Sequence, residues 1–182
     1  MVQSDEELYR QMRKGDQRAF AELYERREPA LFRYAFYLAG SRVVAEEVAH
    51  DAFIELIGRH TRFDERRGSV EAYLYGVARN LVRVIQRRKT FELGVEQTSA
   101  HDVVADLIKG ERNAALYAAI RELPDSYRDA VVLCDLEEKS YEEAALLMKC
   151  ALGTVRSRVY RARMLLAARL KPLMLSAGVR GR

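Results

Sequence analysis

The chain has 182 residues, of which 49% are hydrophobic and 32% charged, and its formal net charge is +4. This composition supplies a packed core and excludes disorder throughout, while ten glycines and three prolines are too few for a collagen-like or turn-rich all-β chain. No apolar run approaches the roughly 20 residues that span a bilayer, and the N-terminal residues lack the pattern of a signal peptide. Two cysteines and three histidines favour a reducing, cytoplasmic compartment, and we expect neither a metal nor another cofactor.

Helical periodicity dominates the first ninety residues, and no convincing strand alternation is present. The apolar spacing predicts helices over residues 5–14, 17–38, 41–58 and 69–89. Turn and capping residues separate these helices at Gly15-Asp16, Gly40-Ser41 and Gly68-Ser69. Pro29 predicts a kink or a break inside the second helix, and the charged segment 63–67 is predicted to be a loop.

A polar connector divides the chain. Residues 91–110 predict a flexible linker, with a short amphipathic segment at 103–108, and the helical pattern resumes at Glu111. Pro124 separates a helix that ends at Leu123 from one over residues 125–135. Further helices are predicted over residues 141–148 and 152–170, and Pro172 is expected to end the last one. The predicted fold is all-α, with two small helical domains at residues 1–90 and 111–174 and a basic tail at 175–182.

The last two predicted helices have the arrangement of a helix-turn-helix. A capping box, Ser140-Tyr141-Glu142-Glu143, opens the first, and the chain from Ala151 onward contains basic residues but no acid. One face of the final helix is apolar, and another carries cations and hydroxyls that can bond base edges or phosphates. The residues on and near that polar face are Thr154, Arg156, Ser157, Arg158, Tyr160, Arg161 and Arg163. The alternative interpretation is an ordinary solvated arginine face.

An acidic stripe lies on the third predicted helix. Glu47, Asp51 and Glu55 follow one another at four-residue spacing, opposite the apolar Ala49, Phe53 and Leu56. Like charges at this spacing cost a few tenths of a kcal/mol per pair. The stripe therefore indicates an external cationic partner, and the alternative is a solvated acidic face.

The C-terminal segment contains several characteristic runs of residues, namely Leu123-Pro124, Arg128, Ser140-Tyr141-Glu142-Glu143-Ala144-Ala145 and Gly153-Thr154-Val155-Arg156-Ser157-Arg158-Val159-Tyr160-Arg161-Ala162-Arg163. Together they resemble the fourth conserved region of bacterial sigma factors of the extracytoplasmic-function (ECF) type. This resemblance implies that the final helix reads the upstream promoter element. Lys149 stands where the family has a glycine, at a position that calls for a left-handed backbone.

The N-terminal half is similar to the second region of the same family. The segment Glu46-Glu47-Val48-Ala49-His50-Asp51-Ala52-Phe53 resembles the helix that docks on the clamp coiled coil of the RNA polymerase β′ subunit, which implies polymerase contacts at Glu47 and Asp51. Residues 69–81 and the basic run after them resemble the element that reads and melts the downstream promoter element. Carried over by position, the DNA contacts there are Arg79, Asn80, Arg83, Arg87 and Arg88.

Strand opening also needs surfaces that receive unstacked bases. Tyr73, Tyr75 and the loop at residues 63–68 are candidates, and core packing is the alternative for each tyrosine. Cys134 lies in an apolar stretch and is interpreted as a core residue, whereas Cys150, in the helix-turn-helix turn, is either inert or a redox-sensitive thiol.

The resemblance implies an alternative sigma factor that binds core RNA polymerase and promoter DNA and is held by an anti-sigma factor. We find no GxxxxGK[ST] loop, no GxGxxG after a strand and no HExxH, so we expect no enzymatic activity. Two other classes stay open at this point. A stand-alone helix-turn-helix regulator predicts a dimer on a palindromic operator, and a helical interaction protein predicts no retention on DNA at moderate salt.

Overall fold

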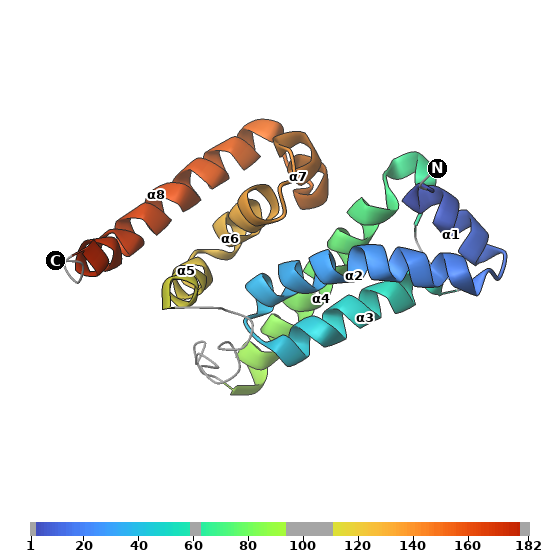
Figure 1. Ribbon diagram of the computed structural model, residues 1–182, viewed down its shortest axis with the longest axis horizontal. Helices are drawn as coiled ribbons and strands as arrows, with labels where there is room; N and C mark the ends of the chain where they lie inside the picture. The colour runs from blue at the N-terminus through green and yellow to red at the C-terminus, as the bar shows by residue number, and fades with distance from the viewer. Residues whose placement is uncertain (1–2, 59–62, 94–110, 179–182) are drawn as a thin grey trace. The chain divides into compact units, whose positions relative to one another are not determined.

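The structure is a computed structural model that describes residues 3–58, 63–93 and 111–178. Within these ranges all regular structure is helical, as predicted (Figure 1). The chain divides into two compact units, residues 1–99 and 100–182, which are described separately below. None of the helices in the described ranges is long and apolar enough to cross a membrane.

The first unit contains the four helices that the sequence predicts. They are α1 (Asp5–Arg13), α2 (Gln17–Ala39), α3 (Arg42–Ile57) and α4 (Val70–Leu93), with a single 3₁₀ turn, η1 (Glu65–Arg67), before α4. N-terminal capping fixes where α1, α2 and α3 begin, because the side chains of Ser4, Asp16 and Ser41 each accept a hydrogen bond from a backbone N–H in the first helical turn. The predicted break at Pro29 is wrong: Pro29 is solvent-exposed and α2 continues through it, at the cost of one hydrogen bond.

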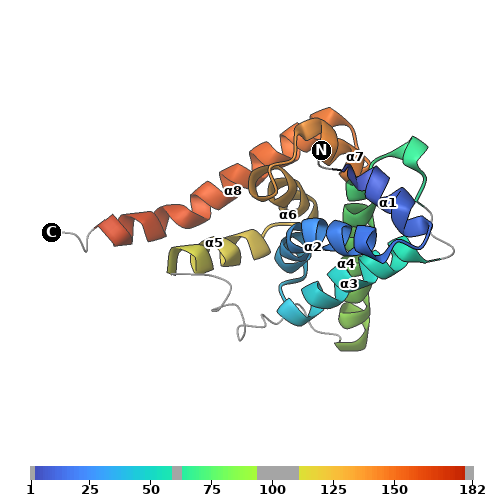
Figure 2. The ribbon, with the colours of Figure 1, turned by 45° about the vertical axis from the view of Figure 1, so that its right-hand side comes forward.

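Helix α2 is the centre of the first unit. It packs against α1, α3 and α4, and the turned view in Figure 2 shows the same grouping. The largest fully buried side chains come from all four helices, and they include Leu8, Leu23, Tyr34, Phe53 and Leu74. Burial of these apolar side chains holds the bundle together and leaves the outer faces of α3 and α4 facing solvent.

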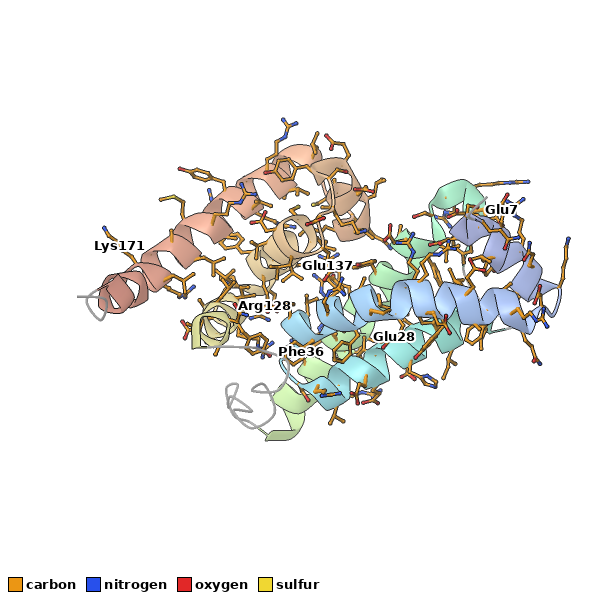
Figure 3. All side chains as sticks on the ribbon, in the orientation of Figure 1. Glu7, Glu28, Phe36, Arg128, Glu137 and Lys171 are labelled. Carbon is orange, nitrogen blue, oxygen red and sulfur yellow. The ribbon has the colours of Figure 1, made fainter. Side chains whose placement is uncertain are left out.

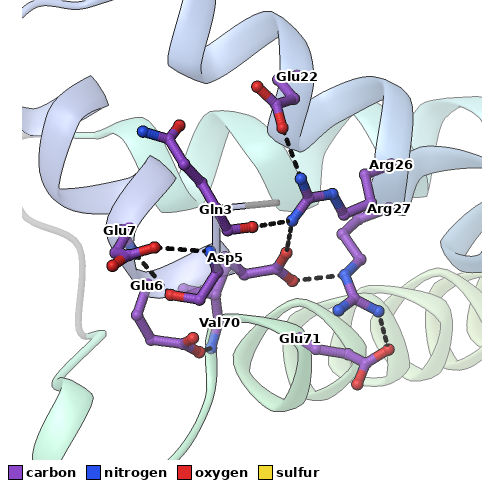
Figure 4. A network of polar contacts seen from close by, with 10 residues as sticks. Gln3, Asp5, Glu6, Glu7, Glu22, Arg26, Arg27, Val70 and Glu71 are labelled. Atoms are coloured by element: carbon purple, nitrogen blue, oxygen red, sulfur yellow. Dashed lines mark hydrogen bonds and ion pairs between the residues drawn. The ribbon is translucent and has the colours of Figure 1, made fainter. Parts of the chain in front are cut away.

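A network of ion pairs ties the start of α1 to α2 and α4 (Figure 4). The Asp5 carboxylate is buried and accepts hydrogen bonds from two arginines of α2, Arg26 and Arg27. Arg27 also pairs with Glu71 in the first turn of α4, and the Glu6 carboxylate accepts from the Val70 N–H at 3.1 Å. These contacts fix the point at which α4 begins.

Replacing Asp5 with alanine is expected to destabilise the first unit by about 2 kcal/mol, because two partly buried guanidinium groups lose their shared acceptor. Chemical denaturation followed by circular dichroism measures the change. Glu22→Ala is the matched control: Glu22 pairs with Arg26 at 2.6 Å but is half exposed, so its loss should cost at most about 0.5 kcal/mol. Equal effects of the two substitutions would contradict the assigned role of Asp5.

The described part of the second unit, residues 111–178, contains five helical segments. They are α5 (Glu111–Arg121), α6 (Asp125–Val131), the π-helical segment η2 (Val132–Leu136), α7 (Tyr141–Met148) and α8 (Leu152–Gly178). Helix α8 packs along α5, α6 and α7 (Figures 1 and 2), around buried Ile120, Leu123, Leu133, Val155 and Val159.

Two predictions for this unit need correction. The helix predicted over residues 125–135 changes from α to π geometry at Val132, where Val132 and Leu133 are fully buried. Pro172 does not end the last helix, since α8 runs to Gly178. A proline removes only one helical hydrogen bond, and the residues that follow it, Leu-Met-Leu-Ser-Ala, form helices readily.

Arg128 joins α5 to α6 (Figure 3). Its side chain is buried, and its guanidinium donates to the backbone oxygens of Ile120, Arg121 and Leu123 at 3.3, 2.6 and 2.8 Å. It also pairs with Asp125 at 3.2 Å. Burial lowers the pKa of this guanidinium from its usual value. Because the last carbonyls of a helix have no helical partner, Arg128 acts as the cap of α5.

Candidate functional site

Helices α7 and α8 form the helix-turn-helix that the sequence predicts. The capping box is present: Ser140 Oγ accepts from the Glu143 N–H at 3.1 Å, and the Glu143 carboxylate accepts from the Ser140 N–H at 2.8 Å. The hydrogen bond from the Ser140 N–H, followed by the Ser140 side chain, holds the pKa of the Glu143 carboxyl below its usual range. The turn passes through Lys149, whose φ of 51° and ψ of 49° are left-handed, as the position of the family glycine implies.

Replacing Lys149 with glycine is expected to stabilise the second unit by about 0.5–1 kcal/mol, because a side chain in the left-handed region is strained. A thermal melt of the full chain checks this, and Lys139→Gly, at a residue with negative φ in the same unit, should be neutral or destabilising. A lower melting temperature for Lys149→Gly would contradict the assigned strain.

Helix α8 presents the two faces that its sequence predicts. Val155, Val159 and Ala162 are fully buried, whereas Arg156, Ser157 and Tyr160 are exposed, Tyr160 by 67%. Thr154 is half-buried at the start of the helix, and its carbonyl accepts from the Ser157 hydroxyl at 3.0 Å. The exposed side chains lie in the first turns of α8, which is the end of a recognition helix that enters the major groove.

The arginines of α8 differ in their surroundings. Arg156 is exposed and makes no hydrogen bond or ion pair with any residue that the structure describes. Arg158 is half-buried beside Cys150 Sγ at 3.7 Å, and Arg161 donates to the Tyr127 hydroxyl at 3.3 Å. Arg163 donates two hydrogen bonds to the Asp135 carboxylate, at 2.9 and 2.6 Å. The sequence pattern does not distinguish these arginines, because their partners lie outside α8.

The two cysteines also differ. Cys134 is half-buried, and burial raises its pKa to about 11, so it is a neutral thiol at physiological pH. This agrees with its interpretation as a core residue. Cys150 is half-buried in the turn before α8.

The acidic stripe of α3 lies where the sequence predicts it. Ala49, Phe53 and Leu56 are buried, while Glu47 and Glu55 are exposed and Asp51 is half-buried. None of these three carboxylates forms an ion pair with a residue in the described ranges. The nearby Arg42 pairs with Glu46 instead, at 2.8 Å.

Sequence reasoning missed an apolar component of the same surface. Val43, Ile54 and Ile57 are 70%, 49% and 42% exposed, and these positions share the solvent-facing side of α3 with Glu47. Residues 43, 47 and 54 are spaced by four and seven, the spacing of a single helix face. This spacing is the feature of the sequence from which the exposed apolar residues of α3 could have been predicted. We call Val43, Glu47, Asp51, Ile54, Glu55 and Ile57 the α3 face.

Helix α4 exposes part of its predicted basic row. Asn80, Arg83, Arg87 and Arg88 are exposed, but Arg79 is only 9% exposed. Residues four positions apart on an α-helix differ in direction by about 40° around the helix axis. Arg79 therefore adjoins the buried side of α4, and Arg87 is turned well away from it.

The apolar residues of α4 differ in their burial. Val82 is buried, whereas Val84 is 37% exposed. Tyr75 is buried against Tyr34, with ring centroids 4.9 Å apart, so core packing is the correct alternative for Tyr75.

The loop before α4 is anchored by aromatic side chains. The Phe63 ring lies 4.8 Å from Tyr9 and 5.4 Å from Tyr73, centroid to centroid. Asp64 then accepts from the Arg66 N–H at 3.0 Å and starts the η1 turn, which the sequence prediction treated as loop. Tyr73 is thus packed on Phe63, while residues 64–68 are exposed at the start of α4.

Comparisons with known proteins match both units. Residues 23–92 match the family Sigma-70 region 2, and residues 113–166 match Sigma-70, region 4. The chain is 28% identical to the ECF RNA polymerase sigma factor SigW of Bacillus subtilis, covering 90% of this chain and 95% of SigW. It is 30% identical to the ECF RNA polymerase sigma-E factor of Escherichia coli, covering 94% of this chain and 96% of that protein.

A solved structure is similar as well. The sigma factor RpoE from Bartonella quintana, in complex with the anti-sigma factor NepR, has a TM-score of 0.72 and 28% sequence identity. The similarity covers 84% of this chain and 96% of that one. The matches span both units in the predicted order and favour a sigma factor over a stand-alone regulator. The chain belongs to the ECF sigma factors, the alternative sigma factors that bind core RNA polymerase and direct promoter recognition and transcription initiation.

Proposed function

We propose that the two units divide the work of this sigma factor between them. Residues 1–90 hold core RNA polymerase through α3 and open the downstream promoter element through α4. Residues 111–174 read the upstream element through α8, and residues 91–110 link the two domains. The chain acts in the cytoplasm, on the polymerase, and has no catalytic activity of its own.

The α3 face carries the polymerase part of the proposal. Its three carboxylates have no cationic partner among the described residues, and three large apolar side chains beside them face solvent. Exposed apolar groups interleaved with unpaired charge are typical of a surface that a partner covers. A basic, partly apolar helical surface complements it, and the clamp coiled coil of the β′ subunit is the proposed partner.

The α4 and α8 surfaces carry the DNA part. Arg83, Arg87 and Arg88 supply cations along α4, and Asn80 adds a hydrogen-bonding amide at the same helix surface. Arg79 is not part of this proposed DNA contact, because its side chain is buried. On α8, we assign the contacts with base edges to Arg156, Ser157 and Tyr160, and the contacts with the DNA phosphate backbone to Thr154, Arg158 and Arg161.

An anti-sigma factor is the proposed inhibitory partner. The similar RpoE structure is a complex with the anti-sigma factor NepR, which supports a partner of this class here. Such a protein would cover surfaces that the polymerase and DNA need, and the α3 face is one of them.

Asp51→Ala is expected to weaken binding of the full chain to purified core RNA polymerase about five- to tenfold, because a carboxylate is lost from the centre of the α3 face. Fluorescence titration at fixed salt measures the affinity. Glu25→Ala, at an exposed carboxylate on α2, is the matched control and should leave it unchanged. An unaltered affinity for Asp51→Ala, with both variants folded, would remove the acidic stripe from the polymerase interface.

A further inference from the structure

One arginine on the polar face of α8, Arg163, is paired with a carboxylate of the same chain. Both the Nε and one terminal nitrogen of Arg163 donate to the two oxygens of Asp135, at 2.9 and 2.6 Å. This fork-to-fork geometry is the most directional pairing available to an arginine and a carboxylate. Hydrogen bonding to Asp135, together with its charge, raises the pKa of the Arg163 guanidinium further above its usual value. The net charge of the pair is zero, so it attracts a phosphate weakly.

The position of Asp135 depends on the π-helical segment η2. Val132 and Leu133 are fully buried and fix the segment in the core, and Asp135 follows two residues later with its side chain 26% exposed. The wider π turn changes the direction in which successive side chains point relative to an α-helix. Short π-helical segments often occur at functional positions. Here the segment brings the Asp135 carboxylate to the side of α8.

A second pair joins α8 to the other end of the unit. Arg169 Nε lies 3.1 Å from the Glu122 carboxylate at the end of α5. The two pairs involve residues six positions apart on α8, on either side of the buried Leu166. Buried apolar side chains resist the separation of two packed helices more strongly than they resist rotation of one helix against the other. The two-point hydrogen bond between Arg163 and Asp135 fixes the direction of both side chains.

We infer that Arg163 is a positioning residue and not a DNA contact: its bidentate pair with Asp135 sets the rotation of α8 on η2, and so presents Arg156 and Tyr160 to the groove. This inference rests on the proposed function of α8 in reading DNA. Among the arginines of α8, it distinguishes Arg156, which is available to nucleic acid, from Arg163, which orients the helix.

The experiment uses the full chain and a fluorescent duplex selected from a randomised double-stranded pool by the wild-type protein. Affinity and its salt dependence are measured for Asp135→Ala, Arg163→Ala, the double alanine variant and the charge-swapped pair Asp135→Arg with Arg163→Asp. Asp135→Asn, which keeps the side-chain volume, is included so that one misfolded variant does not decide the result. Circular dichroism verifies that each protein is helical at the temperature of measurement.

The inference predicts that Asp135→Ala and Arg163→Ala each weaken binding by about three- to tenfold, that the double variant is no worse than either, and that the salt slope is unchanged. The charge-swapped pair should recover part of the loss, although it places an acid on α8. If Arg163 instead touched a phosphate, Asp135→Ala would tighten binding, Arg163→Ala would lower the salt slope by about 1, and the swap would be the weakest binder.

Each of those last results would overturn the inference, as would unchanged affinity in both single variants. Failure of the wild-type chain to select any duplex is a separate outcome. It would overturn the proposed function of α8, and the inference with it. A wild-type protein that binds, with single variants that change affinity in opposite directions, would overturn the positioning role alone.

Discussion

Replacing Arg128 with alanine is expected to destabilise the second unit by about 3–5 kcal/mol, the largest stability effect of any single substitution discussed for this chain. Three backbone oxygens at the end of α5 lose a hydrogen bond from the guanidinium at once; that of Ile120 keeps a second one, from the Leu123 N–H at 3.1 Å, and Leu123 itself is buried. A buried acceptor without a donor costs about 1–3 kcal/mol. Since a small helical domain has only a few kcal/mol of stability, the second unit should be largely unfolded near 37 °C.

Thermal unfolding of the full chain by calorimetry tests this prediction. The transition of the second unit should move far down or disappear, and that of the first unit should not move, because the two units have separate cores. Asp125→Ala is the matched control: Asp125 pairs with Arg128 but is 66% exposed, so its loss should cost at most about 1 kcal/mol. A shift of equal size in both variants would contradict the capping role of Arg128.

Arg156→Ala is expected to weaken binding to the upstream element by about 1–3 kcal/mol if the side chain reads a base. Arg156 is exposed in the first turn and a half of α8 and has no partner among the described residues, so nothing in the free protein competes for its guanidinium. Arg158 is half-buried beside Cys150, so we expect a smaller effect from Arg158→Ala.

The measurement is a competition titration between the selected duplex and variants of it with single base-pair changes. Arg156→Lys separates the two ways of contacting DNA, because lysine keeps the charge but loses the two-point hydrogen bond to guanine. If Arg156 reads a base, the lysine variant should lose discrimination at one position of the duplex. If it touches phosphate, the lysine variant should bind nearly as well as the wild type. Unchanged affinity and salt slope in both variants would mean that the first turns of α8 are not the reading surface.

The features that sequence predicted correctly are local. The helix starts depend on side chains two or three residues from the N–H groups that they cap, such as Ser4, Asp16, Ser41 and Ser140. Likewise, the buried stripe of α8 follows from helical spacing alone. The left-handed Lys149 was predictable because the family places a glycine in that turn.

The features that sequence did not predict depend on contacts between distant segments. The π-helical geometry at Val132 arises where the chain packs into the core, and nothing in its composition marks it. Arg156 and Arg163 are equivalent in the sequence pattern, yet Arg163 finds a carboxylate 28 positions away. Arg79 belongs to the same row as Arg83 and Arg87 but turns toward the buried side of α4.

Transcription in vitro shows whether this chain directs core RNA polymerase to promoters. Purified core polymerase is incubated with genomic DNA of the source organism, with and without the full-length chain, and the 5′ ends of the transcripts are mapped. We expect start sites that appear only with the chain and that share two short upstream elements at a constant spacing. Identical start sites with and without the chain, in the presence of active core polymerase, would show that the chain does not act as a sigma factor.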